Sequence, residues 1–326
     1  MNTALLIGNG FSSQLIPEYK DENIAQCMRG DDNVRAIHTR YCTLFSTFCD
    51  CKSEVDITMQ LDKLGFPNPP ETYDIYFEKY NLKRYTKKSE ILGVETLLKI
   101  GQMFSEICLV DVNDNVTIRD FACQYYWNVG LNGINGIKNP KFNREQFEAF
   151  LNTYEYVFTT NYDTILDDAY EKEVKHLHGS FLIEKDGCVR DNRDNCPDSL
   201  LIWGIDDAEK NQQIDEVSGL HKLNRGFRFN ISKLNMVSAL DGYFRSLCTG
   251  DFSRLDIVGY SGENDKHINR ELVKNSTLNH INYFCSPDKI EDKKLERNIS
   301  KMFDGKFSIK LVIWKDFWNH FMEEDA

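Results

Sequence analysis

Short apolar runs alternate with amphipathic segments along most of the chain, and this alternation predicts strands and helices in turn. The first run, residues 3–7, is followed by a Gly8-Asn9-Gly10 turn and a short helical pattern up to Leu15. Further strand patterns occur at 156–160, 174–178, 200–203, 255–258, 280–285 and 309–313. Helical patterns separate most of them, at 164–173, 231–248, 266–273 and 290–302. We therefore predict an α/β protein with a parallel sheet covered by helices on both faces.

The segment from about residue 31 to residue 153 has a different pattern. Apolar residues recur at helical spacing over 34–49 and again over 91–109. Asn143 stands where it can cap a third helix, which carries Phe147. We predict that 31–153 is a mostly helical module inserted after the first strand. The sheet is then built from residues 1–30 and 154–326.

Polar side chains follow two of the predicted strands. Asn161 comes at the end of the strand at 156–160, and His178 ends the strand at 174–178. Because an open parallel sheet binds ligands at the carboxyl ends of its strands, we expect both side chains to face one crevice. We also expect Asn161 to stand at an exposed strand end and Asp163 to cap the next helix. A turn asparagine and a core histidine are the alternatives, since either residue type often has only a structural role.

His176 is the rival for any role given to His178, because the two side chains share a face of an extended strand. Gly179 favours His178, since a following glycine leaves room for a ligand beside the backbone. We predict that His178 is the reactive histidine and that His176 is structural.

Glycine-containing turns follow two strands. In Gly8-Asn9-Gly10-Phe11-Ser12, backbone amides and the Ser12 hydroxyl can hold a phosphate at the start of a helix. Gly259-Tyr260-Ser261 repeats the arrangement, and Asp265 can cap the helix that follows. A plain strand-to-helix turn is the alternative for each. Two such turns in one sheet favour a dinucleotide ligand.

Charge and composition narrow the classes of partner. A formal net charge of -12 argues against direct binding of nucleic acid, which depends on Lys and Arg neutralising phosphates. No apolar run is long enough to span a bilayer. Met1-Asn2-Thr3 runs straight into an apolar strand without a secretory signal, so we expect a cytoplasmic protein whose 10 cysteines are reduced. No Cys-x-x-Cys pair occurs, and we expect no bound metal.

Taken together, the motifs resemble a known family. In chain order they are Gly8-Asn9-Gly10-Phe11-Ser12, Thr159-Thr160-Asn161-Tyr162-Asp163, His178-Gly179 and Gly259-Tyr260-Ser261. They are similar to the sirtuin-like domains of bacterial anti-phage defence proteins, and the Gly-Asn-Gly-Phe start is especially similar to the AbiH-type abortive-infection branch. Asn282 also resembles the sirtuin position that holds the adenosine ribose.

This resemblance spans nearly the whole chain and implies a single sirtuin-like domain with a Rossmann-like core and NAD as its substrate. It implies that Asn161 and His178 are catalytic. The implied NAD-binding residues are Gly8, Asn9, Gly10, Phe11, Ser12, Thr159, Asp163, Gly259, Ser261, Asp265 and Asn282. Defence-type relatives hydrolyse NAD to nicotinamide and ADP-ribose. The zinc cysteines and the Gly-Ala-Gly start of sirtuins are absent here, which argues against protein deacylation.

The chemistry of NAD cleavage suits these residue types. Nicotinamide leaves as a neutral molecule from a cationic glycoside, so the site needs no general acid and no metal. Asn161 can hold a ribose hydroxyl or a water, His178 can accept a proton, and Asp163 can bind the nicotinamide amide. An NAD-dependent deacylase and a non-catalytic NAD or ADP-ribose sensor are the alternatives. Control by a separate regulatory or sensor protein, or by homo-oligomerisation, is expected.

Overall fold

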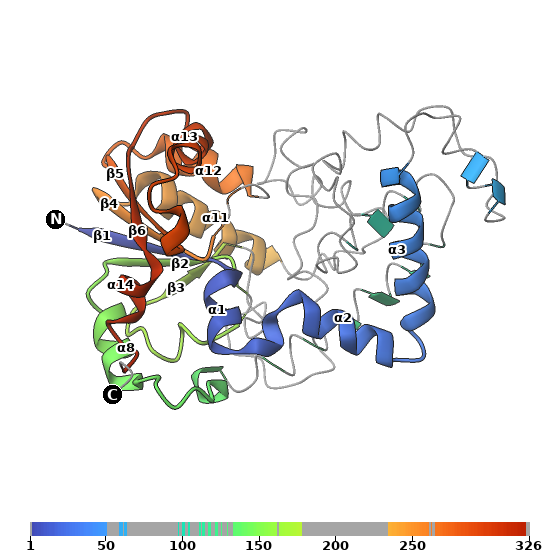
Figure 1. The fold of residues 1–326 in the computed structure, drawn as a ribbon. Helices are drawn as coiled ribbons and strands as arrows, with labels where there is room; N and C mark the ends of the chain where they lie inside the picture. The colour runs from blue at the N-terminus through green and yellow to red at the C-terminus, as the bar shows by residue number, and fades with distance from the viewer. Residues whose placement is uncertain are drawn as a thin grey trace. The chain divides into compact units, whose positions relative to one another are not determined.

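The computed structural model describes residues 2–50, 133–161, 163–177, 234–260 and 265–323, with Gly262 and isolated positions between 59 and 129. These residues form two compact units (Figure 1). The sheet unit comprises the described residues within 1–19, 126–177 and 234–326. The helical unit comprises those within 20–125. The predicted strand at 200–203 and the residues His178, Gly179 and Ser261 lie outside the described part of the chain.

Six parallel strands form the sheet in the order β3-β2-β1-β4-β5-β6 (Figure 1). Their bounds are β1 (Thr3–Ile7), β2 (Tyr156–Thr159), β3 (Val174–His176), β4 (Arg254–Val258), β5 (His280–Cys285) and β6 (Ser308–Ile313). Ile7 pairs with both Thr159 and Val258, so β1, β2 and β4 end at the same level. The strand order changes direction between β1 and β4, which is the arrangement of a Rossmann-like fold. The α/β prediction is confirmed.

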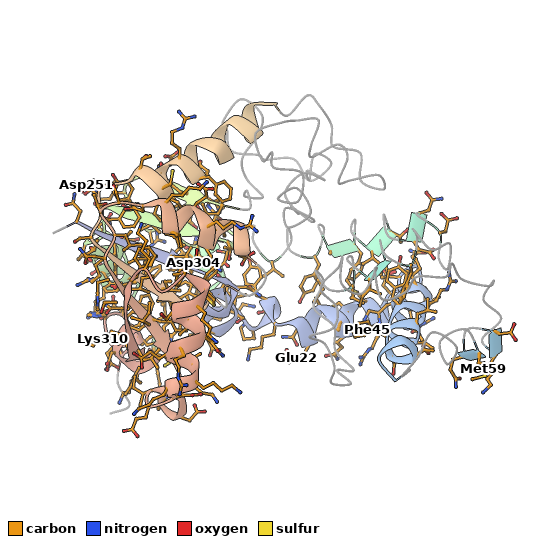
Figure 2. All side chains as sticks on the ribbon, turned by 90° about the horizontal axis from the view of Figure 1, so that it is seen from above. Glu22, Phe45, Met59, Asp251, Asp304 and Lys310 are labelled. Carbon is orange, nitrogen blue, oxygen red and sulfur yellow. The ribbon has the colours of Figure 1, made fainter. Side chains whose placement is uncertain are left out.

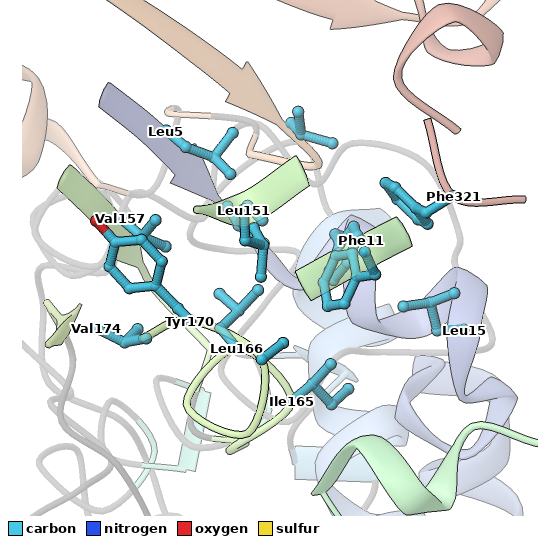
Figure 3. Close-up of a cluster of buried hydrophobic side chains, with 14 of the residues drawn as sticks. Leu5, Phe11, Leu15, Leu151, Val157, Ile165, Leu166, Tyr170, Val174 and Phe321 are labelled. Atoms are coloured by element: carbon cyan, nitrogen blue, oxygen red, sulfur yellow. The ribbon is translucent and has the colours of Figure 1, made fainter. Parts of the chain in front are cut away.

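Helices cover both faces of the sheet, as alternate residues of β1 illustrate. Leu5 and Ile7 belong to a core cluster with side chains of α1 (Asn9–Leu15), α8 (Arg144–Leu151) and α14 (Trp314–Trp318) (Figure 3). Ala4 and Leu6 belong to a second cluster with side chains of α11 (Leu234–Thr249), α12 (Lys266–Lys274) and α13 (Lys293–Met302). The sheet is buried on both faces, which explains why its strands are apolar runs rather than alternating ones.

Helix α8 belongs to the sheet unit although it lies within the predicted helical module. Asn143 caps it as expected, because its side chain accepts a 3.0 Å hydrogen bond from the Gln146 amide. Phe147 and Leu151 then pack in the same cluster as Leu5. The division between the units consequently falls near residues 19 and 126, rather than at the predicted 31 and 153.

Within the helical unit the structure describes α2 (Asp21–Gly30) and α3 (Arg35–Asp50). The predicted helix at 34–49 is thus confirmed, and its apolar stripe, including Phe45, is buried, whereas Met59 is exposed (Figure 2). The described positions within 91–109 are helical and buried: Leu97, Ile100, Gly101 and Phe104. Short 3-10 turns elsewhere in the chain are η1 (Pro17–Tyr19), η3 (Gly133–Gly136) and η6 (Pro287–Lys289). Across the described residues, no helix combines the length and the hydropathy needed to cross a bilayer.

The predicted helix at 164–173 is wrong. The segment is a series of turns with isolated helical hydrogen bonds, such as Tyr170 N–H to the Leu166 carbonyl at 2.9 Å. The Tyr170 hydroxyl donates to the carbonyls of Tyr154 and Glu155 at 3.0 Å each and ties the segment to the start of β2. These tertiary contacts override the local helical pattern.

The turn after β1 and the turn after β4 contact each other at the carboxyl ends of these two central strands. Gly8 N–H donates to the Val258 carbonyl at 2.9 Å, and Gly10 N–H donates to the Gly259 carbonyl at 3.0 Å. A Cβ atom on Gly8 would lie 2.5 Å from the Gly259 carbonyl oxygen. Gly259 has a φ of +66°, and a Cβ there would lie 2.4 Å from the Phe11 nitrogen. These glycines therefore permit the β1 and β4 turns to meet.

We expect Gly259→Ala to lower the free energy of unfolding by about 1–3 kcal/mol, because the left-handed backbone is strained and the new methyl group meets backbone atoms. Gly242→Ala is the matched control, since Gly242 is exposed on α11 and, among the described residues, a methyl group added there would meet no atom within 4 Å outside the backbone of its own helix. It should stabilise the protein by about 0.5–1 kcal/mol. Urea unfolding of both variants tests this. Equal effects of the two substitutions would contradict the backbone contact.

Candidate functional site

Three polar side chains meet where β1, β2 and β4 end. The Asn161 side-chain amide donates to Ser12 Oγ at 2.7 Å, and Ser12 Oγ donates to Asp163 Oδ2 at 2.8 Å. Ser12 comes from the first helix, whereas Asn161 and Asp163 follow β2 about 150 residues later. The structure therefore joins three of the residues that the sequence marked for this edge of the sheet.

Asn161 is buried, with 5% of its surface exposed, so the expectation of an exposed strand end is wrong. Its backbone N–H donates to Thr159 Oγ1 at 3.0 Å, and Thr159 Oγ1 donates to the Ile7 carbonyl at 3.0 Å. Its side-chain nitrogen also lies 3.4 Å from the Gly8 carbonyl oxygen. Thr159 is itself fully buried, and its hydroxyl links the end of β2 to the end of β1.

The side-chain oxygen of Asn161 is a buried acceptor that no described residue supplies with a donor. The orientation of the amide follows from its neighbours. The Gly8 carbonyl can only accept, and the hydroxyl hydrogen of Ser12 is given to Asp163. The amide nitrogen must face both groups, which turns Oδ1 away from them. A buried acceptor left without a donor costs about 1–3 kcal/mol, so a ligand hydroxyl or a water at this atom would be stabilising.

Asp163, the third member of this hydrogen-bonded group, is also buried. Burial raises the pKa of its carboxyl group, against the opposing effect of the Ser12 hydrogen bond. Its Oδ1 accepts from the Ile165 amide at 3.1 Å, so it caps a turn and not the helix that was predicted. The carboxyl group thus anchors the segment after β2 to α1 through Ser12.

His176 lies on β3 with 0% of its surface exposed. Its Nδ1 donates to the Asn161 carbonyl at 2.8 Å, and its Nε2 lies 2.9 Å from Asp167 Oδ2. Burial by itself lowers the pKa of His176, but the Asp167 carboxylate, the Asn161 carbonyl and Asp163 outweigh it and raise the pKa. Both ring nitrogens face acceptors, which favours the doubly protonated ring. His176 is therefore held by hydrogen bonds on both sides of its ring.

Asp167 was not anticipated from the sequence, because its segment read as an ordinary amphipathic helix. The structure places its side chain, 39% exposed, at the far side of the His176 ring from Asn161. The sequence signal that could have identified Asp167 was its position, as an acidic residue in the short segment between Asn161 and the strand that carries His176.

Three backbone amides of the first glycine turn, those of Gly8, Gly10 and Phe11, already donate hydrogen bonds within the protein. Gly8 and Gly10 donate to the β4 turn, and Phe11 N–H donates to the Gly8 carbonyl at 2.9 Å. The Phe11 ring stacks on Trp318 and on Phe147, with ring centroids 5.3 Å and 5.9 Å apart, and it lies within the core cluster (Figure 3). Phe11 therefore anchors the turn in the core. Asn9 is the exposed side chain of this turn.

Asn269 of α12, which the sequence pattern did not single out, holds the turn that follows β4. The Tyr260 hydroxyl donates to Asn269 Oδ1 at 2.9 Å, and the Asn269 amide donates to the Gly262 carbonyl at 2.9 Å. Asp265 occupies the N-cap position of α12, but its side chain makes no capping hydrogen bond, contrary to expectation. Its backbone φ and ψ of -111° and 48° lie outside the extended conformation usual for a cap.

Asn282 lies three residues before the end of β5, away from the hydrogen-bonded group formed by Ser12, Asn161 and Asp163. Its amide nitrogen donates to Asp256 Oδ1 at 2.7 Å, and its oxygen is 2.9 Å from His280 Nε2. Asp256 is buried and also accepts from the Tyr154 hydroxyl at 2.8 Å. Asn282 therefore serves to satisfy a buried carboxylate within the sheet.

No cluster of three or more potential His, Cys, Asp or Glu ligands occurs among the described residues. The chain matches no protein-family model and no curated protein. Its function is therefore argued from the geometry of this site.

We expect Asn282→Ala to lower the free energy of unfolding by about 1–3 kcal/mol, because the buried Asp256 carboxylate loses a donor. Asn279→Ala, an exposed position just before β5, should change stability by less than about 0.5 kcal/mol. Urea unfolding measures both. Unchanged stability of the Asn282 variant, together with lost NAD affinity, would support the ribose-binding role predicted from the sequence.

The His176–Asp167 pair makes stability depend on pH. The folded-state pKa of His176 is raised above its ordinary 6.5, so the pair contributes fully below about pH 6.5 and its contribution is lost as pH rises through the folded pKa. The stability difference between the wild type and Asp167→Asn should therefore be largest below about pH 6.5 and shrink as the pH rises through the folded-state pKa of His176. Chemical denaturation across this range measures it. A difference that grows with pH would contradict the assignment.

Proposed function

We propose that this chain is an NAD glycohydrolase, which cleaves NAD to nicotinamide and ADP-ribose. The observation that carries the proposal is the buried side-chain oxygen of Asn161, which lacks a donor among the described residues. It lies at the carboxyl end of the sheet, beside the point between β1 and β4 where the strand order changes direction. Dinucleotides bind at such points in Rossmann-like sheets.

In this proposal Asn161 is the polar group that the substrate meets. Its oxygen accepts a hydrogen bond from a ribose hydroxyl or from the attacking water. The groups around it fix its direction before the substrate arrives, which is how a preorganised polar group favours a transition state. The ribose becomes cationic as neutral nicotinamide departs, so an oriented dipole and exclusion of water supply the main assistance.

His178 is the proposed base that takes a proton from the ribose hydroxyl or the water. It follows Leu177, whose N–H continues the pairing with β2 by donating to the Thr159 carbonyl at 2.8 Å. An unperturbed imidazole titrates near neutral pH, which suits this role. Asp163 is the proposed partner of the nicotinamide amide, because carboxylate lone pairs remain beyond those used by Ser12 and Ile165.

The pyrophosphate is proposed to lie near the two glycine turns. Since the Gly8, Gly10 and Phe11 amides are engaged within the protein, the exposed Asn9 at the start of α1 is the nearest candidate contact. Ser261 of the β4 turn is the second candidate.

We infer a role as effector in abortive-infection defence against phage, acting in the cytoplasm. The resemblance of the four motifs to defence-type sirtuin-like domains supports this role. Because NAD loss is toxic to the cell that makes the enzyme, its activity is expected to depend on a regulatory or sensor protein or on assembly of several copies.

The test is to incubate the full-length protein with NAD, alone and with proteins encoded beside it, and to measure free nicotinamide. Asn161→Ala should lower kcat by roughly 100-fold, the scale of losing one preorganised polar contact, and His178→Ala should abolish turnover. Asn275→Ala is the matched control. Asn275 is equally buried, but its amide donates to the Leu247 and Gly250 carbonyls on the opposite face of the sheet unit, so the folded variant should keep its kcat.

A folded Asn161→Ala protein with full activity would refute the catalytic role. NAD binding without release of nicotinamide in any mixture would favour a sensor. Nicotinamide release that requires an acylated peptide would favour a deacylase.

A further inference from the structure

We propose that His176 and Asp167 form a positioning pair that fixes Asn161 and thereby sets the rate at this site without touching the substrate. The kinetic consequence rests on the proposed NAD cleavage, whereas the geometric coupling does not. His176 is the donor that holds the Asn161 backbone, and Asp167 holds His176.

Asn161 lies beyond the last paired residue of β2, so the sheet does not hold its carbonyl group. Pairing between β2 and β3 ends with Thr159 and His176, followed by the Leu177 amide bond to the Thr159 carbonyl. His176 Nδ1 supplies the hydrogen bond to Asn161 that the sheet would otherwise provide, at 2.8 Å. With 0% exposure, the ring is enclosed by protein, so it cannot touch a substrate directly.

Three anchors then determine where the Asn161 side-chain oxygen points. The backbone N–H is held by Thr159 Oγ1, the carbonyl by His176 and the side-chain nitrogen by Ser12. Because the N–H and the carbonyl belong to the peptide groups on either side of its Cα, holding both restricts rotation about φ and ψ. Without the hydrogen bond from His176, the Asn161 carbonyl group can rotate. The Asn161 side-chain oxygen is then no longer held in one orientation.

Among the described residues, Asp167 and Asp163 are the charged groups that face His176, and both come from the turns between β2 and β3. Since Nδ1–H is held by the Asn161 carbonyl, deprotonation removes the hydrogen on Nε2. The lone pair of Nε2 then faces the Asp167 carboxylate and repels it. The same turn segment carries Asp163, which binds Ser12, so the disturbance reaches both sides of Asn161.

The kinetic test compares variants that keep or remove the donor. In His176→Asn the side-chain amide nitrogen takes the place of Nδ1 and can still donate to Asn161, whereas His176→Leu has no donor. We expect His176→Leu to lower kcat by roughly 10- to 100-fold with little change in KM, and His176→Asn to keep most of it. A folded His176→Leu protein with unchanged kcat would overturn the proposal, as would equal losses in the two variants.

Asp167→Asn tests the pair at an exposed position that tolerates substitution. The wild-type kcat should fall on the alkaline side as His176 loses its proton. Asp167→Asn should move the alkaline fall to lower pH. Glu171→Gln, the same type of change at an exposed carboxylate on the same segment, should leave the profile unchanged. An alkaline limb that does not move in Asp167→Asn would overturn the proposal.

A readout that needs no catalysis separates this proposal from the proposed function. In nitrogen-15 NMR spectra, the side-chain amide signal of Asn161 should shift with pH at the midpoint of the His176 ring. The midpoint should move to lower pH in Asp167→Asn, and the shift should vanish in His176→Leu. These results in a protein that cleaves no NAD would retain the coupling and refute the proposed function. An Asn161 signal indifferent to pH and to Asp167→Asn would refute the coupling.

Discussion

The contact between the β1 and β4 turns is the constraint on which the site depends. Gly8 and Gly259 bring two backbones so close that a methyl group on either would collide with main-chain atoms. The contact aligns the end of β1 with the end of β4 and sets where α1 begins, and therefore where Ser12 lies. Ser12 in turn receives the Asn161 amide. Glycine turns of this kind are commonly associated with phosphate binding. Here Gly8 and Gly259 allow the two turns to pack against each other.

Asn161 is the residue at which these constraints converge. Its backbone and its side-chain nitrogen are bonded to protein, and its side-chain oxygen is left without a donor among the described residues. An asparagine needed only to end a strand would gain from a partner for that oxygen, since an unmade buried hydrogen bond is costly. We therefore propose a ligand role for this oxygen in preference to a turn or capping role.

Much of the fold could be predicted because the signal for it is local. Burial of the sheet on both faces produces apolar runs such as residues 3–7, and the helices that cover it carry one apolar stripe each. The predictions failed where long-range contacts outweighed local pattern. Tyr170 ties the stretch after Asp163 to the start of β2 and turns an expected helix into a series of turns. The apolar face of α8, which read as part of the helical module, packs against the sheet.

The sequence by itself determined the parallel sheet, its helical layers and the choice of Ser12, Asn161 and Asp163 as residues for its carboxyl edge. Polar residues after apolar strands carry that information because strand ends share one edge. Only the tertiary structure decided which atoms of these residues are already engaged. In the folded protein the Gly8 and Gly10 amides are hydrogen-bonded to other backbone groups. Asn282 donates to Asp256, and His176 pairs with Asp167. Those outcomes depend on which segments distant in the chain meet in space, and hydrogen-bond partners across such distances leave no local pattern.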